Sequence, residues 1–302
     1  MLQVDGVSKR YGRRGPWALD ELSCHFPSGR VCALVGPNGA GKTTLFSVIA
    51  GYLRPDRGVV SLFGEGPFDA LKHKGRVGIL PQDAALNLEL TCVELLTYHG
   101  HLQGIPTAQL SDAIDRALRE VNLVERSRDR VRELSHGMRR RLSAASALLG
   151  APELVLLDEP TAGLDPKEAR HLRDVLTARR GGTTVIISSH NLLELEQLCD
   201  HVVILSSGRC VREGSVDELT RRGQNVRWTL GPGDVPMERL RELLSAHELN
   251  LDGAVLSQVA PADEDLDTSA VVVARELAVA GVAIRGVERG EGLEDAFLAE
   301  VS

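Results

Sequence analysis

Short runs rich in Val, Ile and Leu, bounded by polar residues, recur along the first two thirds of the chain. They lie at Val31–Val35, Leu154–Leu157, Thr184–Ile187 and Val202–Leu205. A run of this length without polar alternation is typical of a strand that is buried on both faces, as in a parallel sheet covered by helices. The pattern therefore predicts an α/β fold with a buried, largely parallel sheet at its core.

Between the first two of these runs, from about residue 83 to 150, the apolar positions change to helical spacing. Leu95 and His99 are four positions apart, and residues 113–119 form an amphipathic stretch. Apolar residues that repeat every three or four positions place one face of a helix on a core. Pro106 marks a helix boundary. We predict a separate helical subdomain in this region.

The strands that flank the predicted core follow a different pattern. Residues 17–26 read as a strand that runs to a turn at Gly29, within an opening segment of alternating strands and turns. Further along, residues 202–205 and 210–214 are joined by a turn that contains Gly208, which is typical of a hairpin. We therefore expect further strands outside the buried runs, near the N-terminus and in a hairpin after the last run.

The sequence changes character after residues 221–225, which we interpret as a linker. Beyond it we predict a strand at 226–230, a helix at 237–247, a strand running into a helix at 269–283, and a final helix at 293–301. These boundaries predict two domains, a large one of residues 1–222 and a small α/β accessory domain of residues 223–302.

Length and composition suit a chain with a sizeable buried core. The chain has 302 residues, of which 43% are hydrophobic and 25% charged, as expected for one large domain with a small one attached. No apolar stretch approaches the roughly 18 residues that a membrane span requires. The first residues do not read as a signal peptide. We therefore expect a cytoplasmic protein.

Neither the charge nor the cysteines indicate a nucleic-acid-binding or disulfide-bonded protein. The formal net charge is −7, so no overall basic surface is available for nucleic acid. Arginines do cluster at residues 126–132 and 139–141, where interleaved acids and helical placement favour a solvated face over a contact with an acidic partner. The five cysteines are scattered without a C-x-x-C pair, which argues for reduced thiols and against a zinc site.

Residues 36–43 carry the most specific chemical signal. They read Gly-Pro-Asn-Gly-Ala-Gly-Lys-Thr, between the run at 31–35 and an apolar stretch that begins after Thr44. This matches the G-x-x-x-x-G-K-[ST] phosphate-binding loop in its strand-to-helix setting, where backbone N–H groups converge on phosphates at a helix N-terminus. Lys42 would then reach the terminal phosphates, and the Thr43 hydroxyl would bind Mg²⁺.

Two adjacent carboxylates follow a second apolar run. Asp158 and Glu159 come at the carboxyl end of the predicted strand at 154–157, the edge at which open α/β sheets hold ligands. The oxygens of Asp158 suit a hard cation, and Glu159 could polarise a water as general base. Beside a phosphate loop, these carboxylates favour a nucleotide-hydrolysing site over a pair of solvated charges.

A third motif makes a family resemblance specific. Residues 133–142 read Glu-Leu-Ser-His-Gly-Met-Arg-Arg-Arg-Leu, similar to the Leu-Ser-Gly-Gly-Gln signature of ATP-binding cassette proteins. The other family motifs are matched by Tyr11 for the aromatic that stacks on adenine, Gln82 for the Q-loop, residues 162–165 for the D-loop and His190 for the switch histidine. Trp17 is a rival for the stacking role. The resemblance covers about residues 1–219.

The resemblance implies a P-loop NTPase cassette fold with a mixed sheet core, an antiparallel β subdomain and a helical subdomain. It also implies ATP and Mg²⁺ as ligands and two cassettes paired head to tail. Ser135 and the backbone around Gly137 would hold the γ-phosphate of the partner's ATP. The implied catalytic residues are Lys42, Glu159 and His190. Nucleotide-binding residues are Tyr11, Gly36, Pro37, Asn38, Gly39, Ala40, Gly41, Lys42, Thr43, Thr44, Gln82, Ser135, Gly137, Asp158 and Asp165, and the Mg²⁺ ligands, partly through water, are Thr43, Gln82 and Asp158.

Two residues depart from the family signature. His136 replaces the first of the paired glycines, and Met138 replaces the glutamine. A glutamine hydrogen bond is worth only about 1 kcal/mol net, so its loss can be tolerated. If the backbone at residue 136 needs a positive φ, histidine is less favourable there than glycine. The sequence leaves open a tolerated variation and a tuned or weakened second site.

We interpret the chain as the ATP-hydrolysing, energy-coupling subunit of an exporter of this family. Since no membrane span lies in the sequence, the resemblance implies a separate polytopic membrane subunit, a second cassette in a homodimer, and a place on the inner face of the cell membrane through that partner. Residues 292–298 are similar to the closing segment of exporter ATPases. The alternatives are a cassette ATPase without a transport role and a regulatory or scaffold subunit that uses ATP only to dimerise.

Overall fold

The computed structural model describes residues 2–12, 15–220, 225–231, 249–252, 254–259, 266–289 and 292–301. Its internal contacts divide the chain into two units, Met1–Ser215 with Glu300–Ser302, and Val216–Ala299. The predicted domain boundary between residues 222 and 223 and the predicted linker lie outside the described residues, apart from Asn225, and stay predictions. The two units are described separately.

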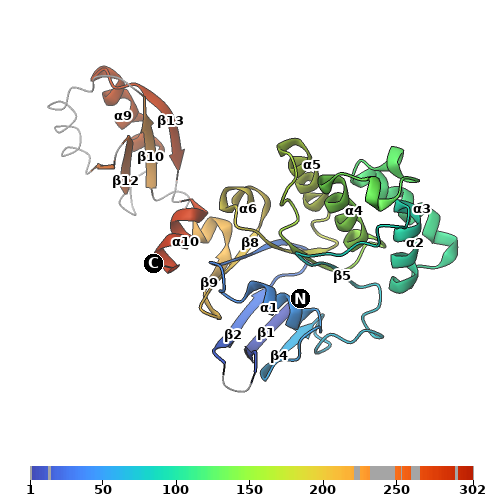
Figure 1. The fold of residues 1–302 in the computed structure, drawn as a ribbon. Helices are drawn as coiled ribbons and strands as arrows, with labels where there is room; N and C mark the ends of the chain where they lie inside the picture. The colour runs from blue at the N-terminus through green and yellow to red at the C-terminus, as the bar shows by residue number, and fades with distance from the viewer. Residues whose placement is uncertain are drawn as a thin grey trace. The chain divides into compact units, whose positions relative to one another are not determined.

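A six-stranded sheet forms the centre of the first unit, in the order β5-β6-β7-β3-β8-β9 (Figure 1). Its strands are β5 (Val77–Leu80), β6 (Leu154–Asp158), β7 (Thr184–Ser188), β3 (Val31–Val35), β8 (His201–Ser206) and β9 (Arg209–Ser215). The first five are parallel and β9 is antiparallel to β8. The four apolar runs of the sequence are four of the parallel strands, and they are buried almost throughout. The predicted mixed core sheet is confirmed.

An antiparallel sheet of three strands covers one side of the first unit, in the order β2-β1-β4. Its strands are β1 (Leu2–Arg10), β2 (Trp17–Phe26) and β4 (Arg57–Leu62). Helix α1 (Lys42–Ile49) shares one hydrophobic cluster with this sheet and with the central sheet, in which Phe26, Leu45 and Ile186 are fully buried. Helix α1 therefore packs against both sheets.

Three helices form a separate layer at one end of the central sheet: α2 (Cys92–Gln103), α3 (Thr107–Glu120) and α4 (His136–Leu148). Two 3₁₀ turns, η1 (Val124–Arg126) and η2 (Val131–Glu133), connect α3 to α4. A capping box of Thr91 and Glu94 begins α2, and Gly104, with φ 79°, ends it. Apolar residues of all three helices share one cluster. The predicted helices between residues 83 and 150 are confirmed.

Two further helices follow strands of the central sheet. Helix α5 (Pro166–Thr177) comes after β6, and α6 (Leu192–Leu198) comes after β7. The Asp165 side chain accepts a hydrogen bond from the backbone N–H of Glu168 at the start of α5. The Asn191 side chain accepts one from the backbone N–H of Glu194 at the start of α6. These side chains satisfy N–H groups that a helix leaves free at its N-terminus.

The second unit is built on a four-stranded antiparallel sheet in the order β11-β12-β10-β13. Its described elements are α7 (Val216–Leu219), β10 (Asn225–Leu230), β11 (Asn250–Asp252), β12 (Val255–Val259), α9 (Leu266–Val279), β13 (Ile284–Arg289) and α10 (Leu293–Val301). Trp228, Leu256 and Leu277 lie fully buried in its core. The predicted strand at 226–230 and the final helix are confirmed, whereas the predicted helix at 237–247 lies outside the described residues.

The prediction of a strand running into a helix at 269–283 is correct for the helix and wrong for the strand. Residues 266–279 form α9 throughout, and a strand follows only at Ile284. The run of three valines at 271–273 suggested a strand because β-branched residues favour one. Val273 and Leu277, four positions apart, are buried, while Val271 is 67% exposed. That is helical periodicity, and packing on the sheet overrides the local preference.

All five cysteines are free thiols, four of them buried and Cys210 partly so. The expectation of reduced thiols, several within apolar strands, is confirmed. Among the described residues, no helix combines the length and the apolar character that a membrane span requires.

Candidate functional site

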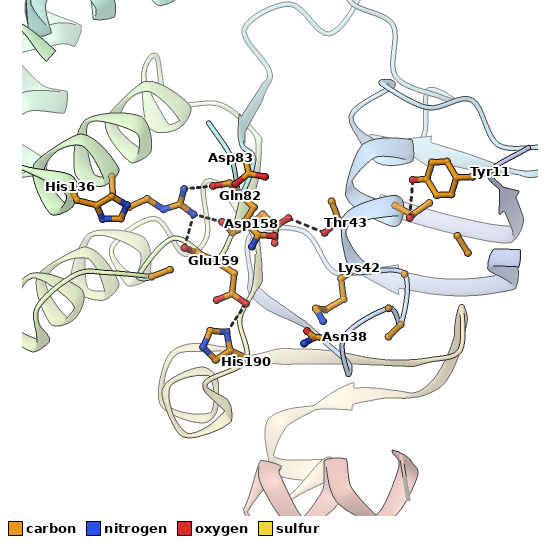
Figure 2. A pocket seen from close by; sticks show the side chains of 17 residues that line it. Tyr11, Asn38, Lys42, Thr43, Gln82, Asp83, His136, Asp158, Glu159 and His190 are labelled. Carbon is orange, nitrogen blue, oxygen red and sulfur yellow. Dashed lines mark hydrogen bonds and ion pairs between the residues drawn. The ribbon is translucent and has the colours of Figure 1, made fainter. Parts of the chain in front are cut away.

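A cavity of about 630 Å³ opens in the first unit at the carboxyl ends of β3, β6 and β7 (Figure 2). A volume of this size is typical of small-molecule sites. Its walls are formed by residues 38–44 of the loop after β3, Gln82 and Asp83 after β5, His136 and Arg140 on α4, Asp158, Glu159, Ala162 and His190, with Tyr11 and Ala18 from the antiparallel sheet region. Motifs that are far apart in the sequence therefore meet at one sheet edge.

The loop between β3 and α1 is shaped by its last glycine. Gly41 has φ 105°, and a Cβ atom there would come within 2.6 Å of the carbonyl oxygen of Ala18. Only glycine fits both the left-handed conformation and this close approach. The loop thus leads directly into the first turn of α1 at the cavity wall, and a helix N-terminus there favours anions.

Lys42 spans this loop and faces the carboxylates across the cavity (Figure 2). Its Nζ donates to the carbonyl oxygens of Gly36, at 2.6 Å, and Pro37, at 3.1 Å. Burial lowers the pKa of Lys42 from its ordinary value, and the negative charges of Glu159 and Asp158 oppose that shift. The arrangement provides a cation whose hydrogen bonds to the loop an anionic ligand can replace.

Asp158 is buried at the end of β6, with a relative exposure of 4%. One carboxylate oxygen accepts from the Thr43 hydroxyl at 3.3 Å, and the other accepts from the hydroxyl of Ser188 on β7. A carboxylate and a hydroxyl side by side are oxygen donors suited to a hard cation such as Mg²⁺. These two residues fit the predicted metal ligands. The Gln82 side chain lines the same cavity.

Glu159 has an unusual backbone conformation, with φ 51°. Its N–H donates to the carbonyl of Ser188 at 3.0 Å, which anchors this turn at the end of β6. The Glu159 carboxylate, 14% exposed, lies 2.9 Å from Nδ1 of His190, whose side chain is 83% exposed. Strained backbone of this kind is often found at functional sites. The turn directs Glu159 into the cavity, whereas the neighbouring Asp158 stays buried in the sheet.

The structure distinguishes between Tyr11 and Trp17, the two candidates for stacking on adenine. The Tyr11 hydroxyl lies 3.2 Å from the Thr44 hydroxyl, and Tyr11 lines the cavity while remaining 60% exposed. Trp17 instead lies against the guanidinium groups of Arg10 and Arg57, 4.8 and 5.5 Å from its ring centre, and is not part of the cavity wall. The geometry brings Tyr11, and not Trp17, next to the phosphate loop.

Five of the predicted nucleotide-binding residues do not line this cavity. Gly36 and Pro37 open the loop, where their carbonyl oxygens accept from Lys42. The other three are Ser135, Gly137 and Asp165. Ser135 is the N-cap of α4, where its hydroxyl accepts from the backbone N–H of Met138 at 3.2 Å. Gly137 lies in the first turn of the same helix, and Asp165 caps α5. All three stand at helix N-termini within this chain. Such positions suit contact with an anion on another molecule.

His136 occupies an ordinary helical position, the first residue of α4, and its φ is not among the positive values. Histidine therefore meets no backbone penalty there. Its ring packs against Gly163 in the predicted D-loop, since a Cβ atom at Gly163 would lie 2.8 Å from Cε1 of His136. The side chain that replaces a signature glycine thus contacts the D-loop of its own chain and faces the cavity.

Sequence reasoning missed Arg140. Its guanidinium donates to the carbonyl oxygens of Gln82, at 3.0 Å, of Glu159, at 2.6 Å, and of Asp158 (Figure 2). One side chain of α4 thus holds the ends of β5 and β6 together. The sequence did contain a signal for this position. Arg140 follows His136 of the signature by four positions, so the two side chains share one face of the helix.

The interpretation of the two arginine clusters as a solvated face is correct for one and wrong for the other. In the cluster at 126–132, Arg126, Arg130 and Arg132 are exposed and form ion pairs on the surface. In the second cluster, Arg140 and Arg141 are only 9% and 7% exposed. Backbone carbonyls accept hydrogen bonds from both buried guanidinium groups, and the Glu168 carboxylate lies 3.2 Å from that of Arg141, which offsets the cost of burying the two charges.

Comparison with known proteins gives one consistent result. The model of the family described as "ABC transporter" matches residues 19–162. Daunorubicin resistance ATP-binding protein DrrA3 of Streptomyces coeruleorubidus is 40% identical over 72% of this chain and 69% of the relative. Nod factor export ATP-binding protein I of Ralstonia nicotianae is 35% identical over 99% of this chain and 92% of the relative, so this likeness extends through the second unit.

Solved structures agree with the sequence comparisons. A chain described as the ATP binding subunit of an ABC transporter is 29% identical, with a TM-score of 0.67, and covers 73% of this chain and 92% of that chain. The predicted cassette fold is confirmed.

Proposed function

Since the chain belongs to the ATP-binding cassette family of transporter ATPases, we propose that it binds and hydrolyses ATP to drive export through a separate membrane subunit. The observation that carries this proposal is the cavity in which Lys42, Asp158, Glu159 and His190 meet. Its relatives include proteins named for daunorubicin resistance and for Nod factor export, which supports an exporter over an importer.

The phosphate loop and Lys42 bind the phosphates. Backbone N–H groups of the loop and the N-terminus of α1 attract the anion, and Lys42 turns from the carbonyls of Gly36 and Pro37 toward the terminal phosphates. Tyr11, at the rim of the cavity, stacks on the adenine. The Thr43 hydroxyl, the Asp158 carboxylate and the Gln82 side chain would hold Mg²⁺, which would neutralise negative charge on the phosphates.

Glu159 acts as general base on the attacking water. Its carboxylate faces the cavity and accepts a proton as the water attacks. His190, whose Nδ1 lies 2.9 Å away, orients this carboxylate. The reaction is transfer of the γ-phosphoryl group to water, in which positioning and charge stabilisation contribute most of the catalysis. The positive φ at Glu159 keeps this side chain apart from Asp158, so that the two carboxylates perform different tasks.

A second copy of the chain completes the site. Ser135 and the N–H groups near Gly137 stand at the N-terminus of α4, where they would hold the γ-phosphate of the partner's ATP, and Asp165 would lie at the same interface. Loss of the γ-phosphate after hydrolysis removes this contact and releases the dimer. ATP binding thereby closes the two cassettes on each other, and hydrolysis opens them.

The membrane partner would contact the region between the central sheet and the helical layer. Gln82 follows β5 and its carbonyl is held by Arg140 of α4, so it stands where these two parts meet. Through that contact the protein would lie on the inner face of the cell membrane. The alternative of a non-hydrolytic scaffold subunit is disfavoured by the Glu159–His190 pair.

The test of this function is the Glu159→Gln variant, which keeps the size of the side chain but cannot accept a proton. We expect hydrolysis to fall by roughly 10²–10⁴, the usual contribution of a general base, while ATP binding survives. Because ATP then stays between two cassettes, the variant should elute as a dimer in size-exclusion chromatography with ATP and Mg²⁺.

The matched control is Glu153→Gln, the same change at a half-exposed carboxylate directly before β6 that pairs with Arg76 outside the cavity. It should hydrolyse ATP at the parent rate. Normal phosphate release by Glu159→Gln would contradict the base assignment. Slow release without a dimer would instead indicate that the signature with His136 does not clasp the partner's nucleotide.

A further inference from the structure

Two imidazoles and a carboxylate from three different strands meet outside the nucleotide cavity. His25 lies near the end of β2, His201 begins β8, and Glu213 lies on β9. One potential metal-binding atom from each lies within 4.8 Å of the other two. None of the three residues lines the nucleotide cavity, so this cluster needs an explanation of its own.

The carboxylate of the cluster is oriented by the backbone. One oxygen of Glu213 accepts from the backbone N–H of His25 at 3.0 Å, and the other lies 3.0 Å from Nδ1 of the same histidine. The first contact fixes the carboxylate plane and leaves the second oxygen facing the imidazole. A hydrogen-bonded carboxylate of this kind is typical of the groups that orient metal ligands.

The second imidazole, that of His201, lies against the protein interior. His201 is only 8% exposed, and its ring centre lies 5.1 Å from that of His25. The side chains of His25 and Glu213 are 46% and 32% exposed. The cluster thus has a buried wall and an open side, through which an ion can enter and a water can complete its coordination.

We propose that His25, His201 and Glu213 form a binding site for a divalent transition-metal ion, for which Zn²⁺ is the probe. Two histidines and a glutamate, with water in the fourth position, are an established donor set for zinc. Ligand bonds of about 2.0–2.2 Å place tetrahedral ligand atoms closer together than 4.8 Å. Binding would therefore draw the three ligand atoms together, and the half-exposed His25 side chain is the least confined of the three.

The cysteines near this cluster do not take part. Burial raises the pKa of Cys210 to about 11 and that of Cys24 well above its usual value, in both cases with a smaller contribution from Glu213. The cluster of potential ligand atoms contains neither of these thiols. The absence of cysteine pairs in the sequence therefore says nothing about a histidine and carboxylate site.

Metal binding here would join two layers of the first unit. His25 belongs to the antiparallel sheet, whereas His201 and Glu213 belong to the antiparallel edge of the central sheet. A ligand that binds only the folded chain raises its stability. We therefore expect Zn²⁺ to raise the unfolding temperature of the full-length protein.

The experiment uses the full chain, treated with a chelator and then titrated with ZnCl₂ in competition with a chromogenic zinc chelator. The parent protein should bind one equivalent at this cluster, and both His25→Ala and Glu213→Gln should lose it, together with the zinc-dependent rise in unfolding temperature. Circular dichroism and ATP binding, which the cluster does not touch, report whether each variant is folded.

Two controls decide where the zinc binds. His101→Ala removes another exposed histidine, on α2, and His190→Ala removes the histidine beside the cavity carboxylates, which are the competing place for a metal ion. Both should keep the equivalent that His25→Ala loses. The proposal is overturned if the parent protein binds no zinc in competition, if His25→Ala and Glu213→Gln bind as much as the parent, or if His101→Ala or His190→Ala loses the same equivalent.

Discussion

Glu159 illustrates how a single backbone angle separates two neighbouring carboxylates. With φ 51°, the chain leaves the alternation of β6 directly after Asp158. Asp158 stays buried beside Thr43 and Ser188, and Glu159 turns toward His190. A left-handed conformation is unfavourable for a residue with a Cβ atom. The hydrogen bond from its N–H to Ser188 helps to hold it.

At the same scale, His136 and Gly163 constrain each other. Gly163 has φ 75°, and a Cβ atom there would come within 2.8 Å of the His136 ring. We predict that Gly163→Ala lowers the free energy of unfolding by about 1–2 kcal/mol from the backbone alone, with a further loss from the clash. Adding His136→Ala should recover only the part caused by the clash, because the backbone strain remains.

Urea unfolding of the parent, the two single variants and the double variant measures this coupling. Strictly additive effects would show that the ring of His136 moves aside freely and does not restrict the D-loop. Coupling would show that the histidine in the signature stiffens the D-loop of its own chain.

At the scale of elements, α4 connects the signature to the catalytic edge of the sheet. Its N-terminus carries Ser135, and one turn later Arg140 holds the carbonyls of Gln82, Asp158 and Glu159. Burial lowers the pKa of Arg140 from its ordinary value, against the raising effect of Asp158, Glu159 and Asp83. A rigid helix with polar contacts at two points can transmit a displacement from one to the other.

We predict that Arg140→Lys impairs hydrolysis more than ATP binding. Lysine keeps the positive charge but lacks the planar fork that reaches several carbonyls at once. Losing these buried hydrogen bonds should lower the free energy of unfolding by about 1–3 kcal/mol. Phosphate release and ATP titration should be measured beside Arg139→Lys, which changes the neighbouring arginine, whose side chain donates to the carbonyl of Leu134. Equal hydrolysis by both variants would contradict the positioning role of Arg140.

At the scale of the whole molecule, the residues of the nucleotide cavity all belong to the first unit. They lie between Tyr11 and His190, and the hydrophobic clusters that support them end at Leu205. The second unit has its own cluster around Trp228. The two parts of the chain thus have separate cores, as expected for parts that can fold independently.

We predict that a chain ending at residue 222 folds and binds ATP. Within the first unit this truncation removes the ion pair between Arg212 and Glu300, whose side chains are about one third exposed. Such a pair contributes roughly 0–1 kcal/mol to stability. Size-exclusion chromatography, circular dichroism and ATP titration, compared with the full chain, provide the test. An aggregated product, or a folded one without ATP affinity, would show that the second unit is part of the cassette core.

The sequence by itself determined the strands of the core, the phosphate loop and the family of the protein. These depend on local properties. An unbroken apolar run marks a strand that is buried on both faces wherever the chain goes, and Lys42 follows its glycines because the loop must be built from adjacent residues. The predicted residues Asp158, Glu159 and His190 could be placed at the same sheet edge, because each follows the carboxyl end of a parallel strand.

Only the tertiary structure decided which distant groups meet. Arg139, Arg140 and Arg141 are identical letters in the sequence, yet two of them are buried, where carbonyls of other segments accept their hydrogen bonds. The valines of α9 favour a strand until the sheet of the second unit selects their helical face. The contact of His136 with Gly163 and the cluster of His25, His201 and Glu213 likewise arise from packing between segments. Local periodicity carries no information about such contacts, because they depend on how separate elements are arranged in space.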